Sequence, residues 1–271
     1  MRIGSCIPGN FQLPGSPAEG EHPTVRALVD GSRHLRELGY DFIEATVESI
    51  ANLSDAEMEK AVQYRKAGLL CLESCNCFIP GTLPLIGEKR DPKKIRAYLE
   101  KTLPRLVRLG VEVVVFGSGG ARWVPEGCSP ETAREHLDQF LRTAEELARK
   151  AGVTLVVEPL NHQQANCIFT VTEAAGIVRR LNLPGLRLLG DTYHMYAEGE
   201  PPEVFFENRD ILRHVHVAEP ESRSAPTDCP YLRQIGDALR RAGYTGRVAM
   251  ECTGDFRENV RNAVPVLRKL F

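Results

Sequence analysis

Val111-Glu112-Val113-Val114-Val115-Phe116 is the stretch that decides the fold class of this sequence. It is almost wholly apolar and β-branched, which is typical of a strand buried on both faces of a parallel sheet. Amphipathic stretches flank it at Asp91–Leu109 and Ser129–Lys150, and each is soon followed by a glycine that can end a helix. The centre of the chain is therefore predicted to run helix, buried strand, helix.

The same alternation extends outward over the whole sequence. Strands are predicted at Arg2–Ser5, Phe42–Ala45, Leu69–Glu73, Val111–Phe116, Val153–Glu158, Leu186–Gly190, Leu212–Val217 and Arg247–Glu251. Helices are predicted at Val25–Leu38, Ser54–Lys66, Asp91–Leu109, Ser129–Lys150, Val171–Leu181, Tyr231–Ala242 and Phe256–Leu270. Between the sixth and seventh strands, only Pro201–Asn208 is expected to form a short helical piece.

Eight β-α units of this kind can form either a doubly wound sheet or a closed barrel. The only glycine cluster, Gly117-Ser118-Gly119-Gly120, lacks the spacing of a dinucleotide-binding or phosphate-binding loop. A doubly wound nucleotide-binding sheet is therefore disfavoured, and no linker or repeat divides the chain. We predict an α/β protein with a single (β/α)8 TIM barrel as its one domain, residues 1–271.

Composition excludes several classes of protein. The 34 lysines and arginines against 36 acidic residues give a formal net charge of −2, which argues against nucleic acid as the main partner. No apolar run approaches the roughly 18 residues of a membrane span, and the N-terminus lacks a signal-peptide core. The eight dispersed cysteines are expected to be reduced thiols with structural roles. We expect a cytoplasmic enzyme without a membrane or nucleic-acid partner.

Polar side chains end four successive strands in the second half of the sequence. Glu158 ends the fifth predicted strand, Asp191 follows the sixth, His216 lies near the end of the seventh, and Glu251 ends the eighth. The carboxyl ends of barrel strands form the face at which TIM barrels carry out their chemistry. We therefore expect these four side chains to converge there.

Three carboxylates and one imidazole form a donor set suited to one divalent metal ion. Mn²⁺, Mg²⁺ or Co²⁺ fits best, with positions left open for substrate, and Zn²⁺ can use the same donors. His194 follows Asp191 by three residues and is either a fifth ligand or a neutral donor to a substrate hydroxyl. His214 faces the same way as His216, one layer deeper, and is expected to support the site rather than bind metal.

These motifs resemble a known superfamily over essentially the whole chain. The resemblance rests on Glu158-Pro159-Leu160-Asn161, Gly190-Asp191-Thr192-Tyr193-His194, His214-Val215-His216-Val217-Ala218-Glu219, Met250-Glu251-Cys252 and Phe116–Arg122. The chain resembles the sugar phosphate isomerase/epimerase superfamily of xylose isomerase-like barrels, which includes ketose 3-epimerases, hydroxypyruvate isomerase, inosose dehydratase and endonuclease IV. The resemblance implies a metal-dependent isomerase or epimerase for a carbohydrate or keto acid, as a homodimer, homotetramer or monomer.

The resemblance also implies roles for the strand-end residues. Glu158 and Glu251 match two metal-bound glutamates that sit on opposite faces of the substrate carbon in ketose 3-epimerases. One would remove a proton beside the carbonyl, and the other would return a proton to the opposite face through a metal-stabilised enediolate. Asp191 and His216 would complete the metal coordination.

Four more residues are candidates for binding or orienting the substrate. His194 matches a histidine that contacts a substrate oxygen, and Glu219 matches a glutamate in the loop after the seventh strand. The family places an arginine six residues after the metal histidine, but this sequence has Ser222 there, followed by Arg223. Arg223 and Arg122 are both candidates for binding a substrate oxygen.

Other functions remain as alternatives. An endonuclease IV-like DNA repair enzyme is disfavoured, since the third and fourth strands end without histidine and Thr227-Asp228-Cys229 replaces the expected Asp-x-His pair. A metal-dependent lyase such as inosose dehydratase begins with the same proton abstraction and is left open. A non-catalytic sugar-binding protein has no need for two opposed glutamates.

Overall fold

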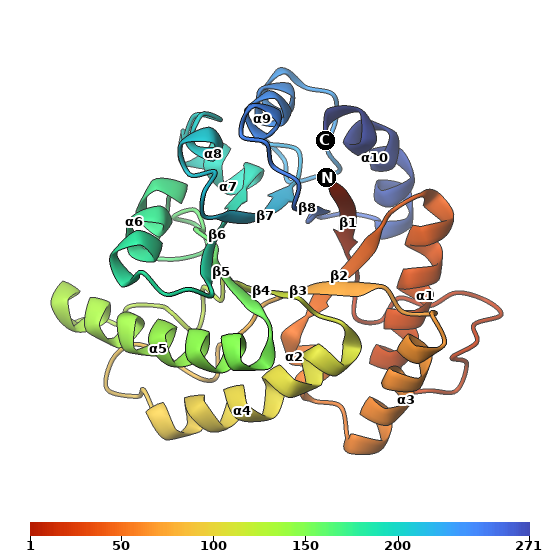
Figure 1. Ribbon diagram of the computed structural model, residues 1–271, viewed down its shortest axis with the longest axis horizontal. Coiled ribbons are helices and arrows are strands. Elements are labelled where there is room, and N and C mark those ends of the chain that lie inside the picture. The colour runs from red at the N-terminus through yellow and green to blue at the C-terminus, as the bar shows by residue number, and fades with distance from the viewer.

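The computed structural model describes residues 1–271 and shows a closed barrel of eight parallel strands. Each strand pairs with the next in chain order, and β8 (Arg247–Met250) pairs back onto β1 (Arg2–Cys6) to close the barrel (Figure 1). Helices surround the strands on the outside, and the two chain termini lie next to each other (Figure 1). This topology confirms the predicted (β/α)8 TIM barrel.

The elements follow the predicted alternation. The other strands are β2 (Phe42–Thr46), β3 (Leu72–Asn76), β4 (Val113–Phe116), β5 (Thr154–Val157), β6 (Leu186–Asp191) and β7 (Leu212–Val217). The helices are α1 (Pro23–Leu38), α2 (Val47–Ala51), α3 (Asp55–Lys66), α4 (Pro92–Leu109), α5 (Pro130–Ala151), α6 (Val171–Leu181), α7 (Thr192–Ala197), α8 (Val204–Glu207), α9 (Pro230–Arg241) and α10 (Phe256–Leu270). None of these helices is both long enough and apolar enough to cross a membrane.

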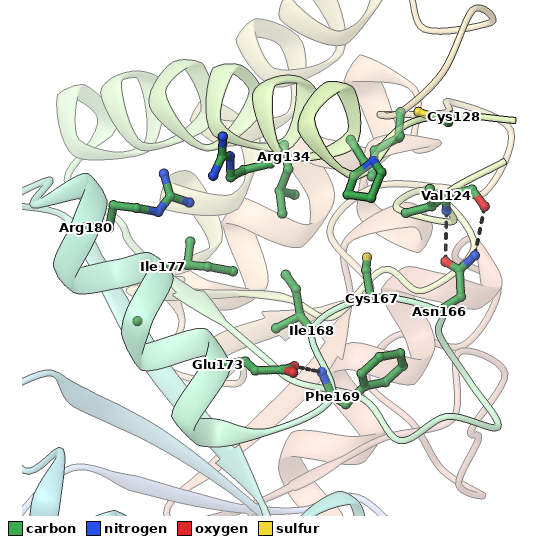
Figure 2. Close-up of a pocket in the computed structure, with 15 residues that line it drawn as sticks. Val124, Cys128, Arg134, Asn166, Cys167, Ile168, Phe169, Glu173, Ile177 and Arg180 are labelled. Carbon is green, nitrogen blue, oxygen red and sulfur yellow. Dashed lines mark hydrogen bonds between the residues drawn. The ribbon is translucent and has the colours of Figure 1, made fainter.

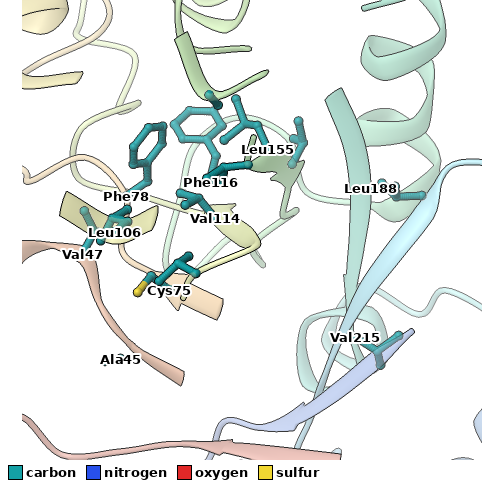
Figure 3. Packing of buried hydrophobic residues seen from close by; sticks show 14 of the residues in the cluster. Ala45, Val47, Cys75, Phe78, Leu106, Val114, Phe116, Leu155, Leu188 and Val215 are labelled. Atoms are coloured by element: carbon teal, nitrogen blue, oxygen red, sulfur yellow. The ribbon is translucent and has the colours of Figure 1, made fainter. Parts of the chain in front are cut away.

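Side chains alternate between two environments along the strands. Outward-facing residues such as Val114, Leu155 and Val215 belong to a core of 63 buried residues that packs the strands against the helices (Figure 3). Their neighbours point to the opposite face and include a small apolar cluster of Val113, Val115, Val156 and Leu189. This apolar packing on both faces is what holds the carboxyl ends of the strands in fixed positions.

Local capping signals set the helix ends that sequence analysis identified. Ser54 and Glu57 form a reciprocal capping box at the start of α3. Gly110 and Gly152 end α4 and α5 with φ angles of 101° and 87°, a left-handed conformation that glycine adopts without steric cost.

Several predictions about elements were wrong in detail, and helix α2 was not expected. Strand β3 begins at Leu72 rather than Leu69, because the Leu69 amide instead donates to the Tyr64 carbonyl and closes the turn after α3. Helix α7 was not expected: the Asp191 carboxylate caps it by accepting hydrogen bonds from the amides of Tyr193 and His194, at 2.7 and 3.0 Å. That cap draws the chain after β6 into a helical turn beside the barrel mouth.

The amino-terminal end of the barrel is closed by an ionic network. Glu73 accepts hydrogen bonds from the guanidinium groups of Arg2 and Arg247, with the Arg247 contact at 2.8 Å. Arg247 also pairs with Glu112 at 2.6 Å. TIM barrels carry out their chemistry at the carboxyl ends of their strands, which is the opposite end of the barrel. We therefore assign this network a role in stability.

Candidate metal centre and active site

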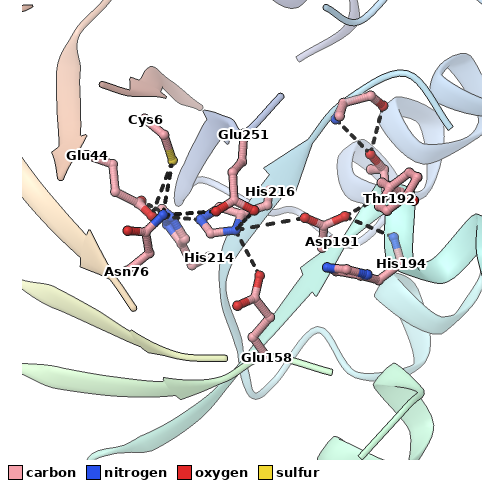
Figure 4. Close-up of polar contacts among 12 residues, drawn as sticks. Cys6, Glu44, Asn76, Glu158, Asp191, Thr192, His194, His214, His216 and Glu251 are labelled. Carbon is pink, nitrogen blue, oxygen red and sulfur yellow. Dashed lines mark hydrogen bonds and ion pairs between the residues drawn. The ribbon is translucent and has the colours of Figure 1, made fainter. Parts of the chain in front are cut away.

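The structure brings together the four strand-end residues named from the sequence. Glu158 and Glu251 directly follow β5 and β8, whereas Asp191 and His216 belong to β6 and β7. One ligand atom from each lies within 4.8 Å of those of the others. Nδ1 of His216 is 3.0 Å from Oε1 of Glu158, 3.5 Å from Oε2 of Glu251 and 3.9 Å from Oδ2 of Asp191 (Figure 4).

The donor atoms of this cluster fit a divalent cation. Asp191 and His216 are fully buried and Glu158 is 5% exposed, so the carboxylates have little water to solvate their charge. Oδ2 of Asp191 is buried without any hydrogen-bond partner. A buried acceptor of this kind is costly unless a cation or donor binds it. Oxygen donors with one imidazole nitrogen suit Mn²⁺, Mg²⁺ or Co²⁺.

The electrostatics of the cluster separate the two glutamates. Burial raises the pKa of Glu158, although His216 bonds to it. Burial opposes ionisation of Glu251 as well, but attraction to His216 and Arg223 lowers its pKa to about 2. Burial alone would lower the pKa of His216, but the surrounding carboxylates raise it well above its usual value. Two nearby carboxyl groups with opposite pKa shifts are typical of an acid and base pair.

Both glutamates line a cavity of about 490 Å³, within the usual size of small-molecule sites. Arg223, Asn76 and Gln164 line the same cavity, and most of its other lining residues are polar or glycine. Asn76 donates from Nδ2 to Oε1 of Glu251 at 2.9 Å, and its Oδ1 is buried without a partner. A cavity with this lining suits a ligand rich in hydroxyl groups.

The glycine cluster after β4 makes room for the site. A Cβ atom on Gly117 would lie 2.1 Å from Oε2 of Glu158, and one on Gly119 would lie 2.4 Å from the main-chain oxygen of Gln164. Both distances are shorter than any real contact, so only glycine fits at these two positions while Glu158 and Gln164 keep their places. The cluster thus has a steric function beside Glu158 and Gln164.

His194 belongs to α7, lies beside Asp191 and is fully buried (Figure 4). Its Nδ1 accepts a hydrogen bond from the Asn161 amide at 3.2 Å, whereas its Nε2 is buried without a partner. A neutral ring therefore carries its proton on Nε2. This geometry agrees with a neutral donor, one of the two roles expected for His194.

Arg223 and Glu219 share the loop after β7 but differ in position. Arg223 donates from Nη2 to Oε2 of Glu251 at 2.8 Å, so the residue one place beyond the expected position reaches the site. Glu219 does not line the cavity: its carboxylate accepts hydrogen bonds from the amide and hydroxyl of Thr227, at 2.9 and 2.8 Å. Glu219 thereby braces the loop that carries Arg223.

Arg122 lies elsewhere than expected. It is completely buried and donates to the main-chain oxygens of Glu158 at 2.8 Å and Ile168 at 3.3 Å. Its guanidinium satisfies carbonyl groups of the segment after β5 instead of lining the cavity. The expectation that Arg122 binds a substrate oxygen is therefore replaced by a structural role beneath Glu158.

Sequence reasoning missed Glu44, which is completely buried in β2. Its carboxylate oxygens lie 2.8 Å from Nε2 of His216 and 2.8 Å from Nε2 of His214 (Figure 4). His214 is completely buried and contacts Glu44 rather than the metal cluster. The available signal for Glu44 was one carboxylate in the otherwise apolar stretch Phe42–Ala45. Two cysteines also border the site: Cys6 approaches Glu44 to 3.6 Å, and Cys77 lines the cavity.

A larger cavity lies elsewhere in the structure. It measures about 620 Å³ and lies between α5, α6 and the loops at 124–130 and 166–169 (Figure 2). Its lining is mainly apolar, and Asn166 is tied to the main chain of Val124 by two hydrogen bonds (Figure 2). It contains no cluster of metal-binding side chains. The candidate metal cluster lies instead at the smaller, polar cavity, which Glu158 and Glu251 line.

Comparisons with known proteins agree with this architecture. A sequence profile of the xylose isomerase-like TIM barrel matches residues 33–270. The chain is 24% identical over 233 residues to 3-dehydro-D-guloside 4-epimerase from Escherichia coli (strain K12), covering 83% of this chain and 86% of the relative. It is 25% identical over 225 residues to D-psicose 3-epimerase from Agrobacterium fabrum, covering 80% and 76%.

A solved structure gives the same result for the fold. The crystal structure of a D-psicose 3-epimerase in the presence of D-fructose superposes with a TM-score of 0.78 at 21% identity, covering 100% of this chain and 99% of the other. The profile spans most of the barrel, including all four strand-end residues. The chain therefore belongs to the xylose isomerase-like TIM barrel family.

Proposed function

We propose that this chain is a divalent-metal-dependent sugar epimerase or isomerase. The observation that carries the proposal is the meeting of Glu158 and Glu251 at one buried donor cluster that opens into a polar cavity. The two relatives described above are both named as epimerases of sugars, which supports this reaction class.

Glu158, Asp191, His216 and Glu251 would hold the cation. The bound cation would polarise the substrate carbonyl and stabilise negative charge on its oxygen. Glu251, ionised and fixed by Arg223, is suited to accept the proton from the carbon beside the carbonyl. Glu158, whose pKa is raised by burial, is suited to return a proton from the other side, and the roles exchange in the reverse direction.

The charge of the cavity favours an uncharged sugar as substrate. Its charged lining residues are the carboxylates Glu48, Glu158 and Glu251 and the single cation Arg223, which is already paired with Glu251. No cluster of free cations is present to bind a phosphate. Oδ1 of Asn76, which lines the cavity and has no partner, is available to a hydroxyl group instead.

The experiment is a screen of ketoses, keto-sugars, hydroxypyruvate, inososes and their phosphates in D₂O with Mn²⁺, Mg²⁺ or Co²⁺. We expect deuterium to enter the carbon beside the carbonyl of an unphosphorylated sugar. Glu158→Gln and Glu251→Gln should abolish the exchange, whereas Glu112→Gln, a matched change at the other end of the barrel, should retain it. Exchange at the wild-type rate in both active-site variants would refute the mechanism, and loss of water from the substrate would identify a lyase.

A further inference from the structure

The carboxylate of Glu44 lies directly behind the proposed metal ligand His216. Oε1 of Glu44 faces Nε2 of His216, and Oε2 faces Nε2 of His214, each at 2.8 Å (Figure 4). The hydroxyl of Ser74 also donates to Oε2. All of these groups are completely buried, so water does not compete for the contacts.

This arrangement makes the two nitrogens of the His216 ring different. A ring nitrogen that faces a carboxylate carries a proton, which places N–H on Nε2. Nδ1 faces Glu158, Glu251 and Asp191, and without a cation it is protonated as well and bonds to Glu158 at 3.0 Å. A cation held by these carboxylates would displace the proton from Nδ1, whereas the proton on Nε2 would keep its bond to Glu44. The orientation of the ring, and the nitrogen that would be left for a cation, are therefore both set from β2, on the far side of the ring from the cluster.

We infer that Glu44 is a positioning residue for the metal site: it holds His216 in the tautomer that presents Nδ1 to the cation. The inference rests on the proposed function, which places a cation at the cluster. Carboxylates behind a ligating histidine orient its ring and raise its basicity, and their loss weakens metal binding. Glu44 itself touches neither the cavity nor the other three ligands and acts through His216.

A second cation between Cys6, Glu44 and His216 is the competing interpretation, since their donor atoms also lie within 4.8 Å of one another. Both oxygens of Glu44 already accept hydrogen bonds, and Nε2 of His216 is one of the donors. By contrast, Oδ2 of Asp191 in the first cluster has no partner. The acceptor without a partner therefore belongs to the cluster of Glu158, Asp191, His216 and Glu251. Glu44, by contrast, already has hydrogen bonds at both oxygens, as expected for a residue that holds His216 in place.

Glu44→Gln tests the inference with almost no change of shape. A glutamine has one oxygen and one NH₂ group, so it cannot accept hydrogen bonds from both histidines in the wild-type arrangement. Titration of the metal-free proteins with Mn²⁺, followed by calorimetry or by electron paramagnetic resonance of the free ion, measures the effect. We expect the affinity for Mn²⁺ to fall about 10–100-fold.

Ser74→Ala is the matched control, because Ser74 bonds to the same carboxylate but only to the oxygen that faces His214. We expect its affinity for Mn²⁺ to change less than about fivefold, as for the loss of one hydrogen bond. Equal affinities of Glu44→Gln and the wild type would overturn the inference, and so would equal losses in the two variants. Absence of Mn²⁺ binding by the wild type would overturn the proposed function itself.

A measurement on the unaltered protein covers the case in which Glu44→Gln does not fold. Nitrogen-15 NMR of the wild type loaded with diamagnetic Mg²⁺ reports which ring nitrogen of His216 carries the proton. We expect the proton on Nε2, protected from exchange by its contact with Glu44. A proton on Nδ1 would overturn the inference.

Discussion

Substituting Gly117 by alanine should damage the chemistry while leaving the fold nearly unchanged. The new Cβ would lie 2.1 Å from Oε2 of Glu158, a distance that must grow to at least 3.0 Å for a real contact. The carboxylate oxygen therefore has to move by about 0.9 Å, the difference between these two values. The φ angle of Gly117 is not in the left-handed region, so alanine introduces no backbone strain.

The size of the effect follows from this displacement. A shift of about 1 Å in a positioned catalytic group costs roughly 100-fold in rate, equivalent to about 2.7 kcal/mol of transition-state stabilisation. We therefore expect solvent-deuterium exchange catalysed by Gly117→Ala to fall about 100-fold. Because the displaced atom is the end of a flexible side chain, the free energy of unfolding should change by less than about 1 kcal/mol.

Gly176→Ala, in α6, is the control away from the site. Its Cβ would meet no atom within 4 Å, and Gly176 does not line the cavity. The assay is the rate of deuterium incorporation at saturating Mn²⁺, together with urea unfolding of both variants. Wild-type exchange by Gly117→Ala, or equal losses in the two variants, would refute the steric argument about Glu158.

Three further predictions concern the metal ligands and the two ends of the barrel. Asp191→Asn should lower the amount of bound metal, measured by elemental analysis after dialysis. Helix α7 should remain, because an asparagine oxygen can still accept the capping hydrogen bonds. A metal content equal to that of the wild type would remove Asp191 from the ligand set. Chelation of the metal should lower the melting temperature, and Mn²⁺ at about 100 times its Kd should restore about 2.7 kcal/mol to the free energy of unfolding. A melting temperature that does not change with Mn²⁺ would contradict a metal site in the folded protein. Glu73→Gln should lower the free energy of unfolding in urea by about 1–3 kcal/mol, because its contacts with Arg2 and Arg247 become weaker. The affinity for Mn²⁺ should stay the same, and a change in that affinity would show that the two ends of the barrel are coupled.

The fold was predictable because its signals are local. The bounds predicted for α6 and α10, Val171–Leu181 and Phe256–Leu270, are those of the structure, since capping residues and helical spacing mark both. The start of β3 was predicted three residues too early, because Leu69 is as apolar as a strand residue. Only the packing of α3 shows that Leu69 closes a turn and stays 38% exposed.

The candidate site was predictable where each residue directly ends an apolar strand. Glu158 and Asp191 are of this kind, since the barrel brings all strand ends to one face. Glu44 was missed because it lies within a strand, and its contact with His216 depends on which side chains meet across the barrel interior. The destination of Arg122 depends on the path of two loops, whose carbonyl groups its long side chain satisfies. Such non-local contacts have no signature in the spacing of residues.

The most direct test of the account is a crystal structure of the protein grown with Mn²⁺, with the ion located by its anomalous scattering. We predict one ion bound by Glu158, Asp191, Glu251 and Nδ1 of His216, with Nε2 of His216 still on Glu44. An ion bound elsewhere, or bound through Nε2 of His216, would contradict the account.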